Sequence, residues 1–299
     1  MRHGRRALAI GMAVGVSVAM GAMARTPRRH IEVQGHRGAR GARPENTLAA
    51  FRYALALGVD TLELDLQVTR DDVLVVSHDA FVFPARCLGP KGKRLRRPVL
   101  IRSLRATEVA RYDCGSLRHP RFPEQHLVPR AHLPRFEEVL KLVAKHHRRR
   151  HPVELNVETK IVPAYPDRSP TPRRFAALVI AALSRHKLVG RTTLQSFDYR
   201  TLRAARRIAP KIRIALLTDG STTDYVALAR RYKAKILSPR HDWITAKDIH
   251  DLHRAGVRVI PWTANDAAVW KRLVAAGVDG IITDYPGKLL RFLKARGLH

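Results

Sequence analysis

The sequence predicts an α/β fold, a (β/α)8 barrel (TIM barrel) with an insertion after the second strand. Three observations support this prediction. Short β-branched runs alternate with amphipathic helical stretches, eight such strand–helix units follow one another within about 270 residues, and no change in composition marks a second domain. A doubly wound sheet fits this count and length less well. An apolar content of 45% is enough for one large core.

The expected strands and helices alternate along the whole chain. The strands are short and rich in β-branched residues, and they are expected at residues 31–34, 61–67, 153–159, 192–196, 213–217, 236–238, 258–262 and 280–283. The helices place apolar residues on one face, and they are expected at residues 47–57, 136–147, 173–185, 199–208, 224–231, 246–255, 266–276 and 286–296.

Residues 1–24 resemble an export signal. A basic start ("MRHGRR") precedes an apolar run, and residues 22–24 form an A-x-A cleavage site. We therefore expect a mature domain over residues 25–299, exported to the periplasm or secreted. An uncleaved membrane anchor is the alternative, because the apolar run is near spanning length.

One segment breaks the alternation of strands and helices. Residues 72–79 resemble a short extra hairpin strand, and residues 80–135 lack helical periodicity and are rich in Pro, Gly and Arg. A connection of that length in a compact domain is usually functional, so we expect an insertion at the mouth of the barrel. It contains both cysteines, Cys87 and Cys114. In an exported chain they are candidates for a disulfide, with two unpaired buried thiols as the alternative.

The chain is strongly basic, with 56 Lys and Arg against 25 Asp and Glu and a formal charge of +31. Such a balance favours anionic partners, among them phosphorylated small molecules and anionic membrane surfaces, although it is also typical of a basic proteome. Aromatic residues are not interleaved with the basic ones, and zinc-finger spacing is absent from the sequence. We expect no specific nucleic-acid partner.

Acidic side chains share one face of the predicted second strand. Along residues 61–67, leucines alternate with Glu63, Asp65 and Gln67, and Glu158 ends the next strand in the same way. In a barrel the leucines would pack against the helices and the carboxylates would lie inside; an edge strand with a solvated acidic face is the alternative. Converging carboxylates repel one another unless a cation neutralises them, and oxygen ligands favour Ca²⁺ or Mg²⁺. The sequence thus predicts a divalent-metal site.

Two histidines follow strand ends, where barrel enzymes carry their chemistry. His36 comes after the first strand and His78 after the hairpin strand. Two imidazoles beside a metal-bound anion can act as general base and general acid. Arg37 and Lys160 would supply fixed positive charge for an anionic substrate.

Seven motifs together resemble the glycerophosphodiester phosphodiesterase family, of the exported bacterial type. In chain order they are "GHRG" with "PENT" (35–47), "ELDLQVTRD" (63–71), "VVSHD" (75–79), "VETK" (157–160), "LQSFD" (194–198), "PWTAND" (261–266) and "GVDGIITDYP" (277–286). The resemblance covers nearly all of the mature chain. It implies a TIM barrel and metal-dependent hydrolysis of a phosphodiester to sn-glycerol 3-phosphate and an alcohol.

The resemblance also implies residue roles by position. His36 and His78 would be the acid–base pair, and Glu63, Asp65 and Glu158 would be the metal ligands. Arg37 and Lys160 would bind the phosphate, and Trp262 would be an aromatic residue of the pocket. Glu45 and Asn46 would shape the first loop. The chain departs from the family pattern at Asp72, where glycine is usual, and at Arg135-Phe136, where Thr-Leu is common.

Two other functions remain open from the sequence. One is a lyase-type phospholipase, in which the substrate's own 2-hydroxyl attacks the phosphate and a cyclic phosphate forms. The other is a barrel without catalytic activity that binds polyanions or lipid headgroups through its basic surface.

Overall fold

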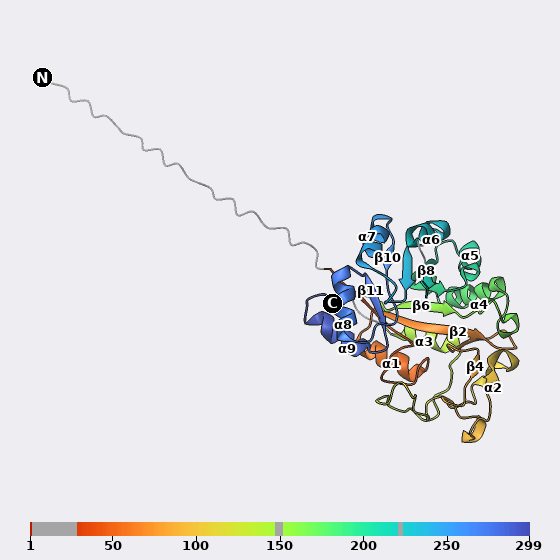
Figure 1. Cartoon of the computed structure of the whole chain (residues 1–299). Helices are drawn as coiled ribbons and strands as arrows, with labels where there is room; N and C mark the ends of the chain where they lie inside the picture. Colours follow the sequence, from red (N-terminus) through yellow and green to blue (C-terminus); the bar gives the residue numbers. More distant parts are fainter. Residues whose placement is uncertain (2–28, 147–151, 221–223) are drawn as a thin grey trace.

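The computed structural model describes residue 1 and residues 29–146, 152–220 and 224–299. Eight parallel strands alternate with helices, which lie around the strands (Figure 1). The strands are β1 (Glu32–Gly35), β2 (Thr61–Val68), β6 (Glu154–Thr159), β7 (Thr192–Ser196), β8 (Arg213–Thr218), β9 (Ile236–Pro239), β10 (Arg258–Val259) and β11 (Gly280–Thr283). The helices that follow them are α1 (Leu48–Leu57), α3 (Phe136–Lys145), α4 (Pro172–Arg185), α5 (Tyr199–Ile208), α6 (Tyr225–Tyr232), α7 (Ala246–Arg254), α8 (Ala267–Ala276) and α9 (Pro286–Lys294).

The strands close into a barrel. Neighbouring strands follow the order β10-β9-β8-β7-β6-β2-β1-β11. The two ends of this order meet, because the N–H groups of Asp279 and Ile282 donate to the carbonyl oxygens of Val259 and Pro261 at 2.9 and 3.0 Å. The predicted (β/α)8 barrel is confirmed.

The bounds of the eight barrel strands and of the helices that follow them lie within two residues of the predicted ones, except at the end of β10. The predicted strand over residues 258–262 is regular only at Arg258–Val259. Its pairing with β9 nevertheless continues, because the N–H groups of Ile260 and Trp262 donate to Leu237 and Pro239 at 2.9 and 3.0 Å. The last predicted residue of the helix at 136–147 lies outside the described residues.

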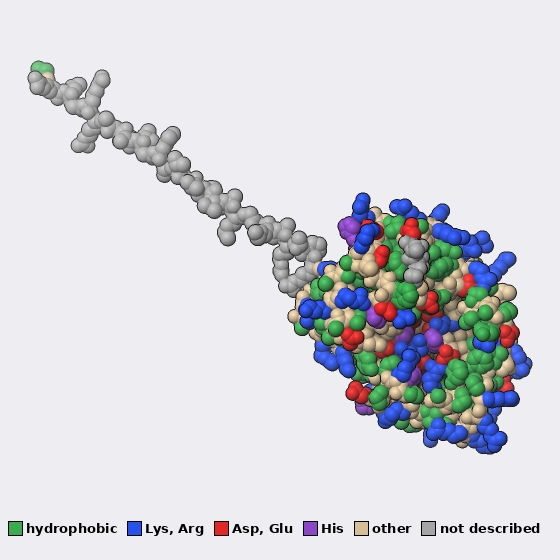
Figure 2. All heavy atoms as spheres, in the orientation of Figure 1, with side chains coloured by type: hydrophobic (Ala, Val, Ile, Leu, Met, Phe, Trp, Pro, Cys, Tyr) green, Lys and Arg blue, Asp and Glu red, His purple; other side chains and the backbone are tan. Residues whose placement is uncertain are grey.

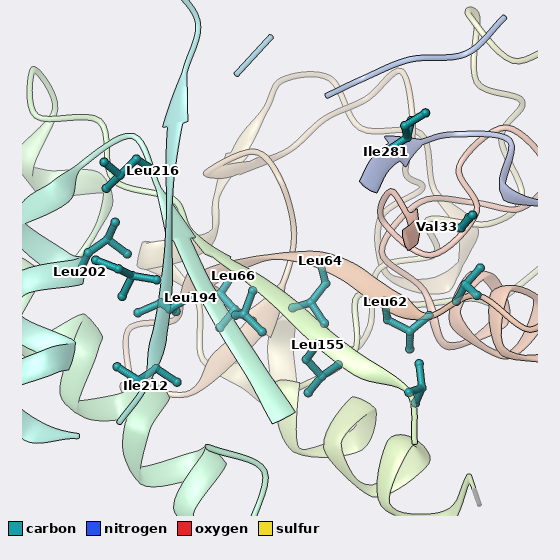
Figure 3. Packing of buried hydrophobic residues seen from close by; sticks show 14 of the residues in the cluster. Val33, Leu62, Leu64, Leu66, Leu155, Leu194, Leu202, Ile212, Leu216 and Ile281 are labelled. Carbon is teal, nitrogen blue, oxygen red and sulfur yellow. The ribbon is translucent and has the colours of Figure 1, made fainter. Parts of the chain in front are cut away.

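The alternation predicted for β2 decides which of its side chains face the helices and which face the inside of the barrel. Leu62, Leu64 and Leu66 are fully buried in the apolar layer between strands and helices, beside leucines of β6 and β7 (Figure 3). Burying one such side chain stabilises the fold by about 1.5–3 kcal/mol. Because β2 pairs with both β1 and β6, it is not an edge strand. Glu63 and Asp65 therefore lie on the opposite, inner side of the strand.

The insertion begins where β3 (Leu74–Val76) pairs antiparallel with the end of β2. It contains a two-stranded sheet and short turns of helix: β4 (Phe81–Val82), β5 (Val99–Leu100), η1 (Pro90–Gly92), η2 (Ile101–Ser103) and α2 (Ala106–Val109). The rest is irregular, as expected. The sequence did not predict α2, because a helix of four residues is too short to show periodicity.

A disulfide between Cys87 and Cys114 closes about half of the insertion, its middle part, into one loop. The two cysteines are therefore bridged, and the alternative of two free thiols is wrong. With a sequence separation of 27, the bond stabilises the fold by about 3–4 kcal/mol in the chain-entropy model. The insertion is fastened to the barrel by Gln125, whose side-chain amide donates to the carbonyl oxygens of Arg40 and Arg43 at 2.7 and 2.8 Å. It therefore lies against the loop after β1.

The predicted leader lies outside the described residues, apart from Met1. Among the helices that the structure describes, none has the length and apolar character needed to cross a bilayer.

Candidate active site

A sharp turn after β1 places His36 at the mouth of the barrel. Gly38 has a φ of +84°, and a Cβ atom there would lie 2.7 Å from the backbone of Ala50. At Gly35 a Cβ atom would lie 2.2 Å from the carbonyl oxygen of Gly38. The chain then enters α1 at Thr47, whose hydroxyl accepts a hydrogen bond from the Ala50 N–H at 3.2 Å. The loop needs glycine at both positions and a capping hydroxyl at its end.

Three carboxylates from β2 and β6 converge inside the barrel mouth. Glu63, Asp65 and Glu158 are 1%, 1% and 6% exposed, and each offers an oxygen within 4.8 Å of the others. Within the described part of the chain, the buried Asp65 Oδ1 has no hydrogen-bond partner. A donor set made only of oxygens, with one oxygen orphaned, fits a hard divalent cation.

The pKa values of these groups show the repulsion that such a cation would relieve. Burial and the neighbouring Asp65 raise the pKa of Glu63 well above its usual range. Burial also raises the pKa of Glu158 to about 7, although Lys160 acts against this. Burial works to raise the pKa of Asp65 too, but Lys160 and Arg37 hold it well below the usual range.

His36 is held by a carboxylate from the far end of the chain. Its Nδ1 lies 2.6 Å from Asp284 Oδ1, just after β11. Asp284 is itself fixed by Arg40, whose Nε and Nη2 each donate to it at 2.9 Å, and by the side-chain amide of Asn265 at 2.8 Å. Burial lowers the pKa of His36 to about 4, against the opposing charge of Asp284. His36 is therefore neutral at pH 7, with Nδ1–H directed at the carboxylate and Nε2 free of its proton.

His78 has a similar arrangement on the side of the insertion. Its Nδ1 lies 3.0 Å from Asp79 Oδ1, and burial lowers its pKa although Asp65 works to raise it. Asp79 pairs with Arg86, which also donates to Glu45 in the first loop at 2.8 Å. Arg86 is adjacent to the bridged Cys87, so the disulfide-closed loop fixes the groups that hold His78.

The predicted cations lie among the acids. Lys160 Nζ donates to Glu158 at 2.8 Å and lies 3.5 Å from Asp65. Arg37 Nη1 donates to Glu45 at 3.0 Å, and its Nε lies 3.2 Å from Asp65. Both side chains therefore partly neutralise the carboxylate cluster and face the same cavity.

The structure brings the predicted site residues together. A cavity of about 540 Å³ opens at the barrel mouth, and seven of the eight line it: His36, Arg37, Glu63, His78, Glu158, Lys160 and Trp262. Asp65 is buried behind this wall. Figure 2 shows histidine, basic and acidic side chains gathered near the middle of the face in view. The volume is in the range of small-molecule sites.

Sequence reasoning missed the groups that orient the site. Asp79, Gln195 and Asp284 lie within the motifs named above, but neither the motifs nor the local pattern assigns a role to them or to Arg40. Gln195 donates to Glu63 at 2.9 Å. A signal was present for both aspartates, because each follows a strand end at the mouth of the barrel.

Comparison with known proteins agrees with this site. Residues 36–288 match the Glycerophosphoryl diester phosphodiesterase family. A glycerophosphodiester phosphodiesterase of Caldanaerobacter subterraneus subsp. tengcongensis is 30% identical over 262 residues, which cover 88% of this chain and 97% of the relative. A crystal structure from Silicibacter pomeroyi, named as a glycerophosphoryl diester phosphodiesterase, has a TM-score of 0.84 at 32% identity and covers 91% of this chain and 96% of that one.

A more distant structure shares the fold. It is a phosphodiesterase of Oleispira antarctica in complex with the product sn-glycerol-3-phosphate, with a TM-score of 0.73 at 21% identity over 88% of this chain and 96% of that one. With the family match spanning most of the chain, the conclusion is plain: this protein belongs to the glycerophosphoryl diester phosphodiesterase family.

Proposed function

We propose that the chain hydrolyses glycerophosphodiesters to sn-glycerol 3-phosphate and an alcohol in the cavity at the barrel mouth. The observation that carries the proposal is the pairing of two carboxylate-held imidazoles, His36 and His78, with a cluster of three carboxylates in one cavity. Family membership supports the reaction class. The product bound by the Oleispira antarctica enzyme supports the substrate class.

In this proposal the two histidines move the protons. One removes a proton from the attacking oxygen, and the other donates a proton to the departing alkoxide. Asp284 and Asp79 accept from the Nδ1 side of each ring and so direct Nε2 as the working atom. Arg37, Lys160 and Trp262 would orient the phosphate and the organic groups around it.

Glu63, Asp65 and Glu158 would hold a divalent cation, Ca²⁺ or Mg²⁺. When bound, the cation supplies positive charge that stabilises the phosphoryl oxygens. The raised pKa values of Glu63 and Glu158 support this assignment, because they indicate that Arg37 and Lys160 leave part of the negative charge of the three carboxylates uncompensated.

Phosphorus NMR of the purified protein with glycerophosphocholine and glycerophosphoethanolamine tests the proposal. We expect glycerol 3-phosphate to form with added Ca²⁺ or Mg²⁺ and not with a chelator. A cyclic phosphate as the end product would favour the lyase reaction. Binding of the diesters without turnover would favour the non-catalytic barrel.

We also infer that the protein is exported and works near anionic membrane surfaces. The leader, the disulfide and the formal charge of +31 support this inference. N-terminal sequencing should find a start near Arg25, whereas retention of residues 1–24 would indicate a membrane anchor. Sedimentation with phosphatidylglycerol vesicles should exceed that with phosphatidylcholine vesicles and fall at high salt.

A further inference from the structure

A second group of metal-ligand side chains lies at the opposite end of the barrel from the active site. It consists of His30, Asp60 and His299, and one donor atom from each lies within 4.8 Å of the other two. His30 precedes β1 and Asp60 precedes β2, so both lie at the N-terminal ends of strands, whereas the catalytic cavity opens at the C-terminal ends. We refer to the three residues as the basal cluster.

Backbone contacts bring the basal cluster together. The Ile31 N–H donates to the carbonyl oxygen of Leu298 at 2.9 Å, which places the segment before β1 beside the segment after α9. The rings of His30 and His299 lie side by side as a result, with centroids 4.7 Å apart. Both rings direct Nε2 toward the same carboxylate, that of Asp60.

The carboxylate of Asp60 is held in place by its own strand neighbours. Its Oδ2 accepts from the Val33 N–H at 2.8 Å, and the backbone of Asp60 pairs with Val33 at 3.1 Å and with Glu154 at 2.8 Å. The side chain of His299 is nearly enclosed, with 9% of it exposed, whereas that of His30 is 55% exposed. Two of the three ligands are thus preset, and the third can adjust on the solvent side.

The distances in the basal cluster differ from those of two ordinary hydrogen bonds. His299 Nε2 lies 3.0 Å from Asp60 Oδ2, which is a hydrogen-bond length. His30 Nε2 lies 3.4 Å from Asp60 Oδ1, which is longer than the usual range of about 2.7–3.2 Å. Two ligands that each lie about 2.0–2.1 Å from a tetrahedral Zn²⁺ are about 3.3–3.4 Å apart. The donors can therefore converge on one ion through movement of the exposed His30 side chain.

Asp279 provides an internal comparison, because it repeats the arrangement with one histidine. It precedes β11, its Oδ2 accepts from the Val259 N–H at 2.7 Å, and His253 Nε2 lies 2.9 Å from the same oxygen. One histidine and one backbone N–H are thus enough to satisfy a carboxylate at this end of the barrel. The second imidazole at Asp60 goes beyond that need.

We propose that His30, Asp60 and His299 bind one Zn²⁺ ion, which fastens the segment before β1 to the segment after α9. Three protein ligands leave a fourth position for water on the exposed side. Two imidazoles and one carboxylate favour Zn²⁺, whereas the all-oxygen cluster at the barrel mouth favours Ca²⁺ or Mg²⁺. The two sites therefore select different ions, and this inference does not depend on the proposed function.

Zinc titration of the full chain, prepared without a histidine tag, tests the proposal. The protein is stripped with a chelator and titrated by calorimetry in a large excess of Mg²⁺, which competes for the carboxylates at the barrel mouth. We expect one Zn²⁺ ion to bind per chain. The melting temperature should rise with zinc concentration, because an ion that binds the folded chain stabilises it.

His30→Gln and His299→Gln each remove one ligand. Loss of a residue that merely supports a metal ligand already lowers metal affinity about 10–100-fold, so we expect each variant to bind zinc about 100-fold more weakly or not at all. Their melting temperatures should no longer respond to zinc. Asp60 is left intact, because its carboxylate also accepts from the Val33 N–H and its loss would disturb the fold.

His253→Gln is the matched control, since it breaks the same kind of histidine–carboxylate contact at Asp279. It should bind zinc like wild type. Equal zinc affinity in wild type, His30→Gln and His299→Gln would overturn the proposal, and so would a wild-type chain that takes up no zinc. Glu63→Gln should retain the ion. Loss of zinc in that variant, with retention in both histidine variants, would place the ion in the catalytic cavity and contradict the proposal.

Discussion

The contact between His36 and Asp284 gives a sharp test of the acid–base proposal. Asp284→Asn keeps the size of the side chain and removes its charge. The wild-type carboxylate lies 2.6 Å from His36 Nδ1 and is ionised, because His36 and Arg40 hold its pKa far below the usual range despite burial. A hydrogen bond to a charged group contributes about 1.5–3 kcal/mol. Losing that amount in the transition state lowers the rate about 10- to 150-fold.

We expect kcat to fall toward the upper end of this range, because asparagine can also donate to Nδ1 and stabilise the wrong tautomer of His36. KM should change little, since the phosphate-binding cations remain. The assay is steady-state release of glycerol 3-phosphate at saturating divalent cation.

Asp224→Asn is the matched control. Asp224 caps α6 and accepts from the Ala227 N–H at 2.7 Å, and asparagine caps equally well. It should leave kcat and stability unchanged. If Asp284→Asn folds like wild type and keeps kcat within about threefold, His36 does not act as an oriented acid or base.

Four further predictions concern the metal site, the histidines and the disulfide. In metal-free protein the raised pKa of Glu158 contributes to the free energy of unfolding below about pH 4.5, and this contribution, up to about 3 kcal/mol, is lost as pH rises through about 7. Thermal melts should show the loss. Glu158→Gln should remove the pH dependence, and Ca²⁺ or Mg²⁺ should restore the stability at the higher pH. Glu63→Gln should remove most activity, and full activity in chelator-treated wild type would contradict the metal assignment. His36→Ala and His78→Ala should each lower kcat about 10²–10⁴-fold on glycerophosphodiesters, whereas a nitrophenyl ester should largely rescue the variant that lacks the acid. Replacing Cys87 and Cys114 by serine should lower the free energy of unfolding by about 3–4 kcal/mol in urea titrations, and an unchanged value would show that the bridge does not constrain the unfolded chain.

The parts of the fold that the sequence predicts are those with a local pattern. The alternation of leucines with Glu63 and Asp65 along β2 is such a pattern, and it places both carboxylates inside the barrel. Asp72 is another case. It takes a left-handed φ of +58° in the turn before β3, which explains why glycine is usual there, and Arg102 and Arg174 pair with its carboxylate.

The parts that the sequence did not predict depend on contacts between distant residues. Asp284 meets His36 across 248 positions because β1 and β11 are neighbours at the closure of the barrel. The sequence leaves the pairing of the two cysteines open for the same reason, since only the folded insertion brings their Cα atoms within 4.1 Å. Composition and periodicity carry no information on such distances.

Phosphorus NMR of glycerophosphocholine turnover in oxygen-18 water tests the central claim most directly. The two-histidine mechanism predicts glycerol 3-phosphate with oxygen-18 on phosphorus, formed only with divalent cation and slowed in parallel by His36→Ala and His78→Ala. Accumulation of a cyclic phosphate without the label, or turnover that neither a chelator nor the two variants affect, would contradict it.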